Sequence, residues 1–284
     1  MTTNDIILRM KTEIEKNEGI NADDRRVAHE VMQQVALAGL YRGGFFEKAS
    51  FYGGTCLRMI YNQKRFSEDM DFSLDVSDSN FDIAQYFRCV REEFISLGIN
   101  VEITKKEKKS NNAIESAFLK SDTLIYDIGI MGKPNIKIKL EVDTDPPPKF
   151  ETESKLINLP FRYYVKCYAL PDLYAGKMHA LIYRKWKNRV KGRDWYDFAW
   201  YVQNGAELNL EHFSARVSQF EKKKNYNVTK EEFLDILSDT IQNTDIESAK
   251  RDIENFVYDE RELNIWSKKF FIDLIPFIKF KRNT

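Results

Sequence analysis

A glycine-rich turn followed by two closely spaced acids is the feature that most constrains this chain. Gly53 and Gly54 end a short apolar run, and Thr55 opens a helix-like segment. A second strand-like run then carries Asp69 and Asp71. Residues two apart on a strand point to the same face, so these carboxylates repel each other unless a cation lies between them. The segment therefore predicts a strand, a helix and a second strand with a cation site on one face.

The turn and the acids together indicate nucleotide chemistry. Mg²⁺ is the hard cation that suits clustered oxygens. The backbone N–H groups of the turn lie at the start of a helix, where they suit phosphate. We therefore predict that Gly53, Gly54 and Thr55 bind a triphosphate and that Asp69 and Asp71 bind Mg²⁺.

A regular alternation over 136–143 supplies a third carboxylate. Apolar residues occupy one face of this predicted strand, and two lysines, Glu141 and Asp143 occupy the other. If the strand lies beside 68–74, Glu141 could join the acidic pair around one ion, an arrangement typical of metal-dependent phosphoryl transfer. The alternation also fits a half-exposed edge with solvated charges. The sequence does not decide whether Glu141 or Asp143 is the third acidic ligand.

Basic residues are concentrated between Lys177 and Arg193, where no acid interrupts them. Such a block suits a triphosphate or an RNA backbone, although a solvated helix and loop would have the same composition. Gly176 costs helix stability, which suggests a close approach by another group. Asp194 has the properties of a helix cap. In a functional interpretation it orients Lys177 or acts as a base on an attacking hydroxyl.

The composition sets limits on the class of protein. The chain has 284 residues, of which 43% are hydrophobic, enough for two domains of ordinary size. The net charge is zero, so a basic site must be local. No apolar run is long enough to span a membrane, and the first residues lack a signal-peptide pattern. The three cysteines fit neither a disulfide framework nor a zinc site, and we expect a cytoplasmic protein.

The pattern along the chain predicts an α+β fold in two domains. The expected strands are 49–53, 68–74, 99–105, 114–119, 123–130, 136–143 and 161–168. The expected helices are 23–40, 56–62, 80–97, 171–185, 192–203, 230–241, 245–258 and 264–280, the last bent at Pro276. We therefore expect a core domain with a mixed sheet at 1–170, followed by an all-helical domain at 171–284.

Five short segments occur in a fixed order along the chain. They are Tyr52-Gly-Gly-Thr-Cys-Leu-Arg58, Arg65-Phe-Ser-Glu-Asp-Met-Asp-Phe72, Lys139-Leu-Glu-Val-Asp-Thr-Asp-Pro-Pro-Pro148, Ala175-Gly-Lys-Met-His-Ala-Leu181 and Lys191-Gly-Arg-Asp-Trp-Tyr-Asp197. Their order resembles the successive motifs of the AbiEii nucleotidyltransferase toxins, which belong to bacterial abortive-infection toxin–antitoxin systems. The resemblance extends over about 45–203, and the segment that follows matches no motif that we recognise.

The resemblance implies a polymerase-β-like nucleotidyltransferase core and transfer of a nucleotide from an NTP, with the tRNA 3′ end as the expected acceptor. The motif residues carry over as Gly54 and Thr55 for the loop, Asp69 and Asp71 for the metal, Lys177 for the triphosphate, Asp194 for catalysis and Glu141 as a third acid. Arg65 and Ser67, in the second motif, are also assigned to nucleotide binding. An antitoxin encoded nearby need not contact the protein directly.

Two alternatives remain open on the residues alone. The same fold could transfer a nucleotide to a small molecule or to a protein side chain, although a cationic small acceptor would require an acidic lining rather than the basic block. The chain could also be a non-catalytic module that binds nucleotide or RNA. Intact Asp69 and Asp71 argue against this module, because a degenerate site usually loses its metal ligands first.

Overall fold

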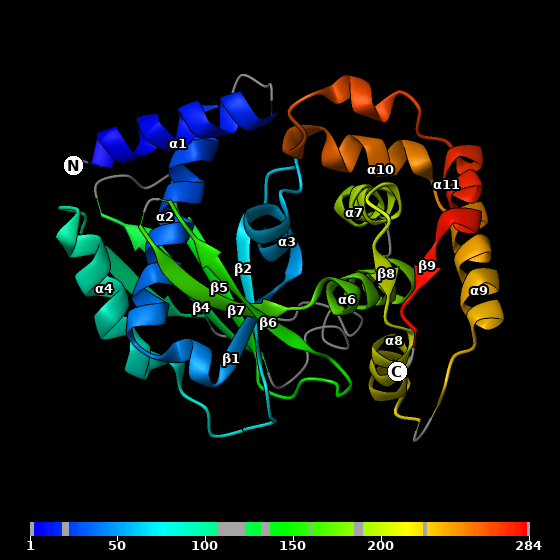
Figure 1. Ribbon diagram of the computed structural model, residues 1–284, viewed down its shortest axis with the longest axis horizontal. Helices are drawn as coiled ribbons and strands as arrows, with labels where there is room; N and C mark the ends of the chain where they lie inside the picture. The colour runs from blue at the N-terminus through cyan, green and yellow to red at the C-terminus, as the bar shows by residue number, and fades with distance from the viewer. Residues whose placement is uncertain are drawn as a thin grey trace. The chain divides into compact units, whose positions relative to one another are not determined.

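The chain folds into two compact units (Figure 1). The computed structural model describes residues 3–18, 23–106, 123–131, 137–159, 161–184, 190–223 and 226–282. The first unit consists of Met1–Pro146 and Thr152–Cys167, and the second of Pro147–Glu151 and Tyr168–Thr284. The chain therefore passes between the units three times. The division into domains at 170 stays a prediction, and it differs from these units by placing 147–151 and 168–170 in the first domain.

A mixed seven-stranded sheet forms the centre of the first unit, in the order β3-β4-β5-β2-β1-β7-β6. The strands are β1 (Ala49–Tyr52), β2 (Asp69–Leu74), β3 (Val101–Lys105), β4 (Thr123–Ile130), β5 (Lys137–Asp143), β6 (Thr152–Ile157) and β7 (Tyr163–Tyr168). β2 is antiparallel to β1 and parallel to β5, and β1 is parallel to β7. The predicted α+β class with a mixed sheet is confirmed. The predicted strand at 114–119 and Ile136 lie outside the described residues.

The alternation along β2 and β5 separates an apolar face from a charged one. The apolar face consists of Met70, Phe72, Leu74, Ile138, Leu140 and Val142, all buried. Phe45 and Phe51 pack on Phe72 with ring centroids 5.1 and 5.2 Å away. The opposite face presents the charged side chains of both strands. The core therefore holds the two strands in register, and that register places the charges.

Helices cover the first unit. They are α1 (Thr3–Glu18), α2 (Asp24–Arg42), α3 (Gly53–Tyr61) and α4 (Phe87–Ser96), with short 3₁₀ turns at Phe45–Glu47 and Ile83–Tyr86. α2 runs across the sheet and α3 lies beside β2 (Figure 1). A Cβ at Gly39 of α2 would lie 2.6 Å from the Cα of Val90, so α2 and α4 are in close contact. Arg58 of α3 pairs with Glu30 of α2 at 2.9 Å, and both are buried.

The second unit is mainly helical. Its helices are α6 (Leu170–Tyr183), α7 (Gly192–Gln203), α8 (Leu210–Glu221), α9 (Lys230–Asn243), α10 (Ile246–Ile253) and α11 (Lys268–Leu274), with 3₁₀ turns at Glu254–Phe256, Glu260–Leu263 and Ile275–Phe277. The prediction of a wholly helical domain is wrong, because β8 (Glu207–Leu208) and β9 (Lys279–Phe280) form a parallel pair. The predicted helix at 264–280 is shorter, since Pro276 interrupts it and the chain then enters β9.

The segment 147–151 is bound firmly within the second unit. The ring of Phe150 stacks on Tyr168, with centroids 4.3 Å apart. The His212 ring donates to the carbonyl of Pro148 at 2.9 Å. The N–H of Glu151 donates to Asp172 at 3.0 Å. These contacts explain why five residues that precede β6 belong to a unit whose remainder begins after β7.

Candidate active site

The turn between β1 and α3 brings a backbone directly against an acid. Gly53 has φ +77°, a left-handed conformation that favours glycine. A Cβ at Gly53 would lie 2.1 Å from Oδ2 of Asp71. β1 and β2 pair so that Tyr52 is opposite Asp71, which explains this proximity. Backbone conformation and space therefore both require glycine at 53.

The next residues attach the turn to the start of β2. A Cβ at Gly54 would lie 2.6 Å from the guanidinium of Arg65 and 3.0 Å from the Ser67 hydroxyl. The Thr55 hydroxyl lies 2.9 Å from that of Ser67 and donates to the carbonyl of Asp69. Thr55, Arg65 and Ser67 are buried. Their side chains support the turn, and a direct contact with nucleotide stays a prediction for all three.

The first turn of α3 has the donors that a phosphate needs. The N-cap residue, Tyr52, provides no side-chain cap. Backbone N–H groups at an uncapped helix start retain their capacity to donate to an anion. The backbone of Gly53, Gly54 and Thr55 therefore has a geometry that suits the predicted binding of a triphosphate.

The two predicted acidic strands are neighbours. β2 and β5 run parallel, with Asp69 beside Lys139 and Asp71 beside Glu141. Residues that face each other on adjacent strands point to the same side of the sheet. The four side chains therefore form a charged array on one face, and the condition set in the sequence analysis, that the two strands lie side by side, is met.

Lys139 modifies the expected cluster of three acids. Its ammonium donates to Oε1 of Glu141. Burial lowers the pKa of Lys139, but the carboxylates of Glu141, Asp69 and Asp71 raise it, and the net shift is upward. Among the described residues, no three His, Cys, Asp or Glu side chains form a group that could hold a metal ion. Glu141 is thus paired with a lysine, and its role as a third ligand remains a prediction.

Asp143 is placed differently from Glu141. It is buried, and its carboxylate accepts from the N–H of Asp145 at 3.1 Å. It lies one repeat further along β5, opposite Ser73 of β2. Of the two acids considered for a third ligand, only Glu141 lies directly beside Asp71.

Lys177 and Asp194 form a second group, in the second unit. The ammonium of Lys177 on α6 lies 2.8 Å from Asp194 and 2.8 Å from Asp197, both on α7. Asp194 and Asp197 are three apart on the helix and so share one face. This spacing was available in the sequence, and Asp197 was overlooked. A Cβ at Gly176 would lie an ordinary 3.5 Å from the Arg216 guanidinium, so crowding does not explain the glycine.

Asp194 is an ion-paired acid rather than a helix cap. The N-cap of α7 is Lys191, and Asp252 accepts from the N–H of Gly192 at 2.9 Å. The cap interpretation of Asp194 is therefore wrong. Burial raises the pKa of Asp194, but Lys177, Arg184 and Lys191 lower it far more, so the carboxyl stays ionised.

Lys191 adds positive charge beside this pair. Burial, assisted by the nearby cations Arg184, Arg193 and Lys177 and opposed by Asp194, lowers the pKa of Lys191 to about 8. Arg193 lies over the ring of Phe256 at 4.3 Å. The predicted basic stretch at 185–189 lies outside the described residues.

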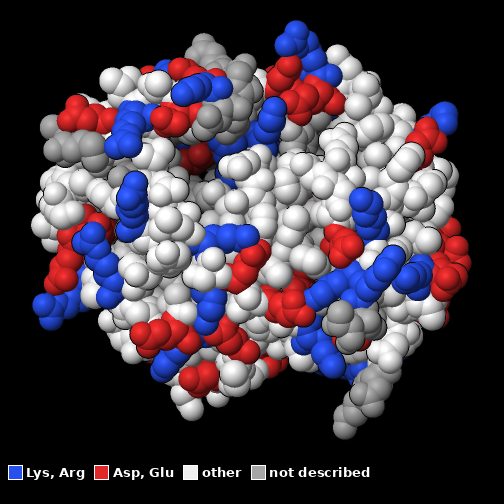
Figure 2. Space-filling view, viewed as in Figure 1, with Lys and Arg blue, Asp and Glu red and all other residues white. Residues whose placement is uncertain are grey.

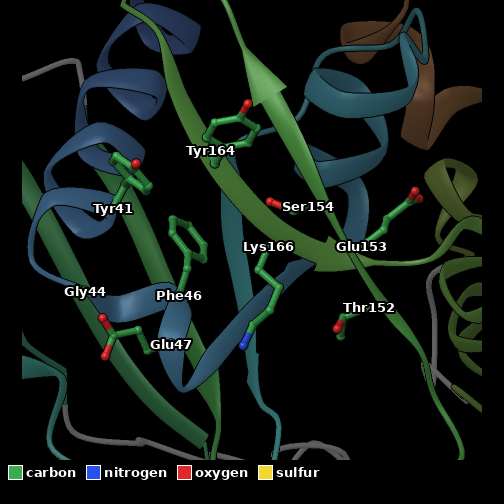
Figure 3. Close-up of a pocket in the computed structure, with 9 residues that line it drawn as sticks. All are labelled: Tyr41, Gly44, Phe46, Glu47, Thr152, Glu153, Ser154, Tyr164 and Lys166. Atoms are coloured by element: carbon green, nitrogen blue, oxygen red, sulfur yellow. The ribbon is translucent and has the colours of Figure 1, made fainter.

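The first unit contains a cavity of about 480 Å³ (Figure 3). Its lining consists of Tyr41, Gly44, Phe46, Glu47, Thr152, Glu153, Ser154, Tyr164 and Lys166. None of the predicted site residues lines it. Lys166 pairs with Asp75, which also accepts from Ser50 at 2.7 Å. The cavity therefore does not change the assignment of the site.

Comparison with known families decides the identity. The family model described as the nucleotidyl transferase AbiEii toxin of type IV toxin–antitoxin systems matches residues 35–270. The chain belongs to the AbiEii family. The resemblance drawn from the five motifs is confirmed, and the match continues through most of the segment in which no motif was recognised.

Solved structures show the same fold at low sequence identity. MenT4, a nucleotidyltransferase toxin from Mycobacterium tuberculosis H37Rv, is 16% identical with a TM-score of 0.57, over 98% of this chain and 89% of that one. JHP933 from Helicobacter pylori is 16% identical with a TM-score of 0.53, over 89% of each chain. A comparison with curated proteins finds no match. No helix in the described part of this AbiEii protein is long and apolar enough to cross a membrane.

Proposed function

We propose that this AbiEii toxin is an Mg²⁺-dependent enzyme with a polymerase-β-like core that transfers nucleotides from an NTP to the tRNA 3′ end. The observation that supports it most directly is the position of Asp69 and Asp71. They share one face of the sheet, and Asp71 lies against the backbone of Gly53 at the start of α3. Carboxylate oxygens and helix-start N–H groups are thus adjacent, as metal and triphosphate require.

The residues present fit Mg²⁺. Asp69 and Asp71 are half-buried oxygen donors on one face. These two side chains would hold the ion. When bound, Mg²⁺ supplies charge neutralisation for phosphate oxygens and activation of the attacking hydroxyl.

The first unit contributes phosphate binding through its backbone. Gly53 and Gly54 let the turn lie directly against Asp71, Arg65 and Ser67, because a Cβ at either position would collide with these side chains. The buried hydroxyls of Thr55 and Ser67 hold the turn at the start of β2. The triphosphate therefore binds to a turn that is already formed.

In the second unit, Lys177 is the proposed cation for the triphosphate. Two of its three N–H groups are directed at Asp194 and Asp197, and among the described residues the third remains for a phosphate oxygen. A carboxyl whose pKa is far below neutral is a poor proton acceptor, since an effective base has a pKa near the working pH. Asp194 therefore positions Lys177 rather than deprotonating the acceptor.

A transfer assay tests the proposal. The protein is incubated with total tRNA and each α-³²P-labelled NTP in turn, in Mg²⁺ and in EDTA. We expect labelled tRNA in Mg²⁺ with at least one NTP, no label in EDTA and no label with Asp69→Asn. Label on another acceptor would replace tRNA in the proposal, and binding of NTP without transfer would favour the non-catalytic module.

A further inference from the structure

Lys139 lies among the acids that are proposed to bind the metal. The β2–β5 register places it directly beside Asp69, and Glu141 follows two residues later on the same face of β5. Across the other edge of β5, Asp127 of β4 is opposite Lys139. Asp127 is itself paired with Lys106 at 3.1 Å and with Lys137 at 2.8 Å. Among these neighbours, the ammonium of Lys139 donates to Glu141.

The charges of this array do not call for two metal ions. Asp69, Asp71 and Glu141 carry three negative charges, and Lys139 carries one positive charge. One divalent cation would neutralise the remainder, whereas a second would leave an excess of positive charge before any phosphate arrives. The ammonium thus already occupies the position of a cation beside Glu141.

We propose that Lys139 is a built-in counter-cation that withholds Glu141 from the metal, so that Asp69 and Asp71 alone bind one divalent ion in the nucleotide-free protein. This inference rests on the proposed function. It makes Lys139 a positioning residue that sets the affinity of the site for its cation. It also makes Glu141 a partner of Lys139 rather than a resident ligand.

The first test measures binding of Mn²⁺ alone, by electron paramagnetic resonance and calorimetry, without nucleotide. In Lys139→Gln, Glu141 is released and a repelling positive charge is removed. We expect Mn²⁺ to bind at least about tenfold more tightly, because a single charge near a divalent ion is worth about that much even when water screens it. Lys139→Arg keeps the charge and should bind Mn²⁺ as the wild-type protein does.

Lys137→Gln is the matched control. It removes the same charge from the same face of the same strand, but its partner is Asp127. We expect its Mn²⁺ affinity to stay within about threefold of the wild-type value, since exposed charges further away are screened. Thermal melts of all variants establish that each is folded before titration.

A double variant tests the role of Glu141. Adding Glu141→Gln to Lys139→Gln should remove part of the gain, because the released carboxylate is the additional ligand. If the double variant binds Mn²⁺ as tightly as Lys139→Gln, then Glu141 is not what Lys139 withholds, and the proposal is overturned.

The remaining outcomes separate this inference from the proposed function. If the wild-type protein binds Mn²⁺ and Lys139→Gln binds it no more tightly, only the inference is overturned. If neither protein binds Mn²⁺, the metal-dependent function fails and the inference fails with it. An Mn²⁺ signal that Asp69→Asn leaves unchanged would place the ion elsewhere and reject both.

Discussion

The carboxylate of Asp71 lies against the α-carbon of Gly53, and this contact leads to the first prediction. Gly53→Ala should reduce transfer by at least about tenfold, because the new Cβ would displace the acid, and should cost roughly 1–2 kcal/mol of stability for the left-handed backbone. Gly98→Ala is the control: its φ is +71°, but a Cβ there meets nothing within 4 Å. It should lose similar stability and keep its activity. Equal activity losses in both variants would show that the space beside Asp71 is irrelevant.

Removal of either acid gives the second prediction. Asp69→Asn and Asp71→Asn should each retain less than about a tenth of wild-type transfer, because an amide removes one charge from the ligands of the ion. Their melting temperatures should stay near or above that of the wild-type protein, since one charge of a repelling pair is lost. Transfer rates are measured on the same preparations. Higher activity in both variants would remove these residues from the metal site.

The lowered pKa of Lys191 leads to a prediction about activity at alkaline pH. With a pKa of about 8, Lys191 loses its charge as the pH rises through that value, and its attraction for phosphate is lost with it. The kcat/KM for NTP should therefore fall above about pH 8 in the wild-type protein. Arginine stays charged throughout this range, so Lys191→Arg should maintain kcat/KM to a higher pH. Identical pH profiles for the two proteins would exclude Lys191 from phosphate binding.

At the scale of elements, one lysine joins α6 to two acids of α7. Lys177→Met should destabilise the fold by about 3 kcal/mol or more, because two buried carboxylates lose their counter-charge. Adding Asp197→Asn should restore part of this stability, and transfer should remain impaired in both variants if Lys177 binds phosphate. Chemical denaturation and steady-state kinetics measure the two effects separately. Recovery of transfer in the double variant would reduce Lys177 to a structural role.

The helices and strands that could be predicted from the sequence are those in which apolar residues recur at helical or strand spacing. β5 alternates without a break, so its two faces could be assigned from the sequence, whereas its place beside β2 could not. β6 alternates only in the exposure of its side chains; its residues are mostly polar and it is an edge strand, so no apolar alternation marks it in the sequence. β8 and β9 have two residues each and exist only through pairing with each other. α8 did carry a signal, with Asn209 capping its first turn, and was overlooked.

The site was predictable in its residue types but not in its contacts. The acidic pair and the glycine turn are separated by one helix in the sequence, and the pairing of β1 with β2 brings them together. The pairing of Lys139 with Glu141 depends on which of several oppositely charged neighbours the lysine reaches. The burial of Thr55, Arg65 and Ser67 likewise depends on packing between α3 and β2, which no local period reveals.

At the scale of the whole molecule, charge is spread rather than concentrated. Figure 2 shows basic and acidic side chains interspersed over the face in view, in keeping with a net charge of zero. Long-range attraction of RNA is therefore weak, and recognition of an acceptor depends on local contacts. We expect transfer to tRNA to depend less steeply on salt than it would for a strongly basic protein.

Growth of the host gives the prediction for the whole protein. Expression without its antitoxin should arrest bacterial growth reversibly, because the family consists of toxins. Asp69→Asn should relieve the arrest at an equal level of protein, measured by immunoblot. Arrest by both forms would show that the effect does not require transfer.

The chain crosses between its two units three times, and these crossings limit where a hybrid with a related protein can be joined. Suppose that residues 168–284 were replaced by those of a relative. The segment 147–151 would then come from this chain, and Phe150 would pack on the relative's residue at position 168 instead of on Tyr168. The stacked ring and the carbonyl bound by His212 must be inherited together with the helices they contact. Hybrids that fold should therefore be joined before residue 147. The exchanged part then includes β6 and β7 together with the helical unit, although these strands belong to the sheet of the first unit.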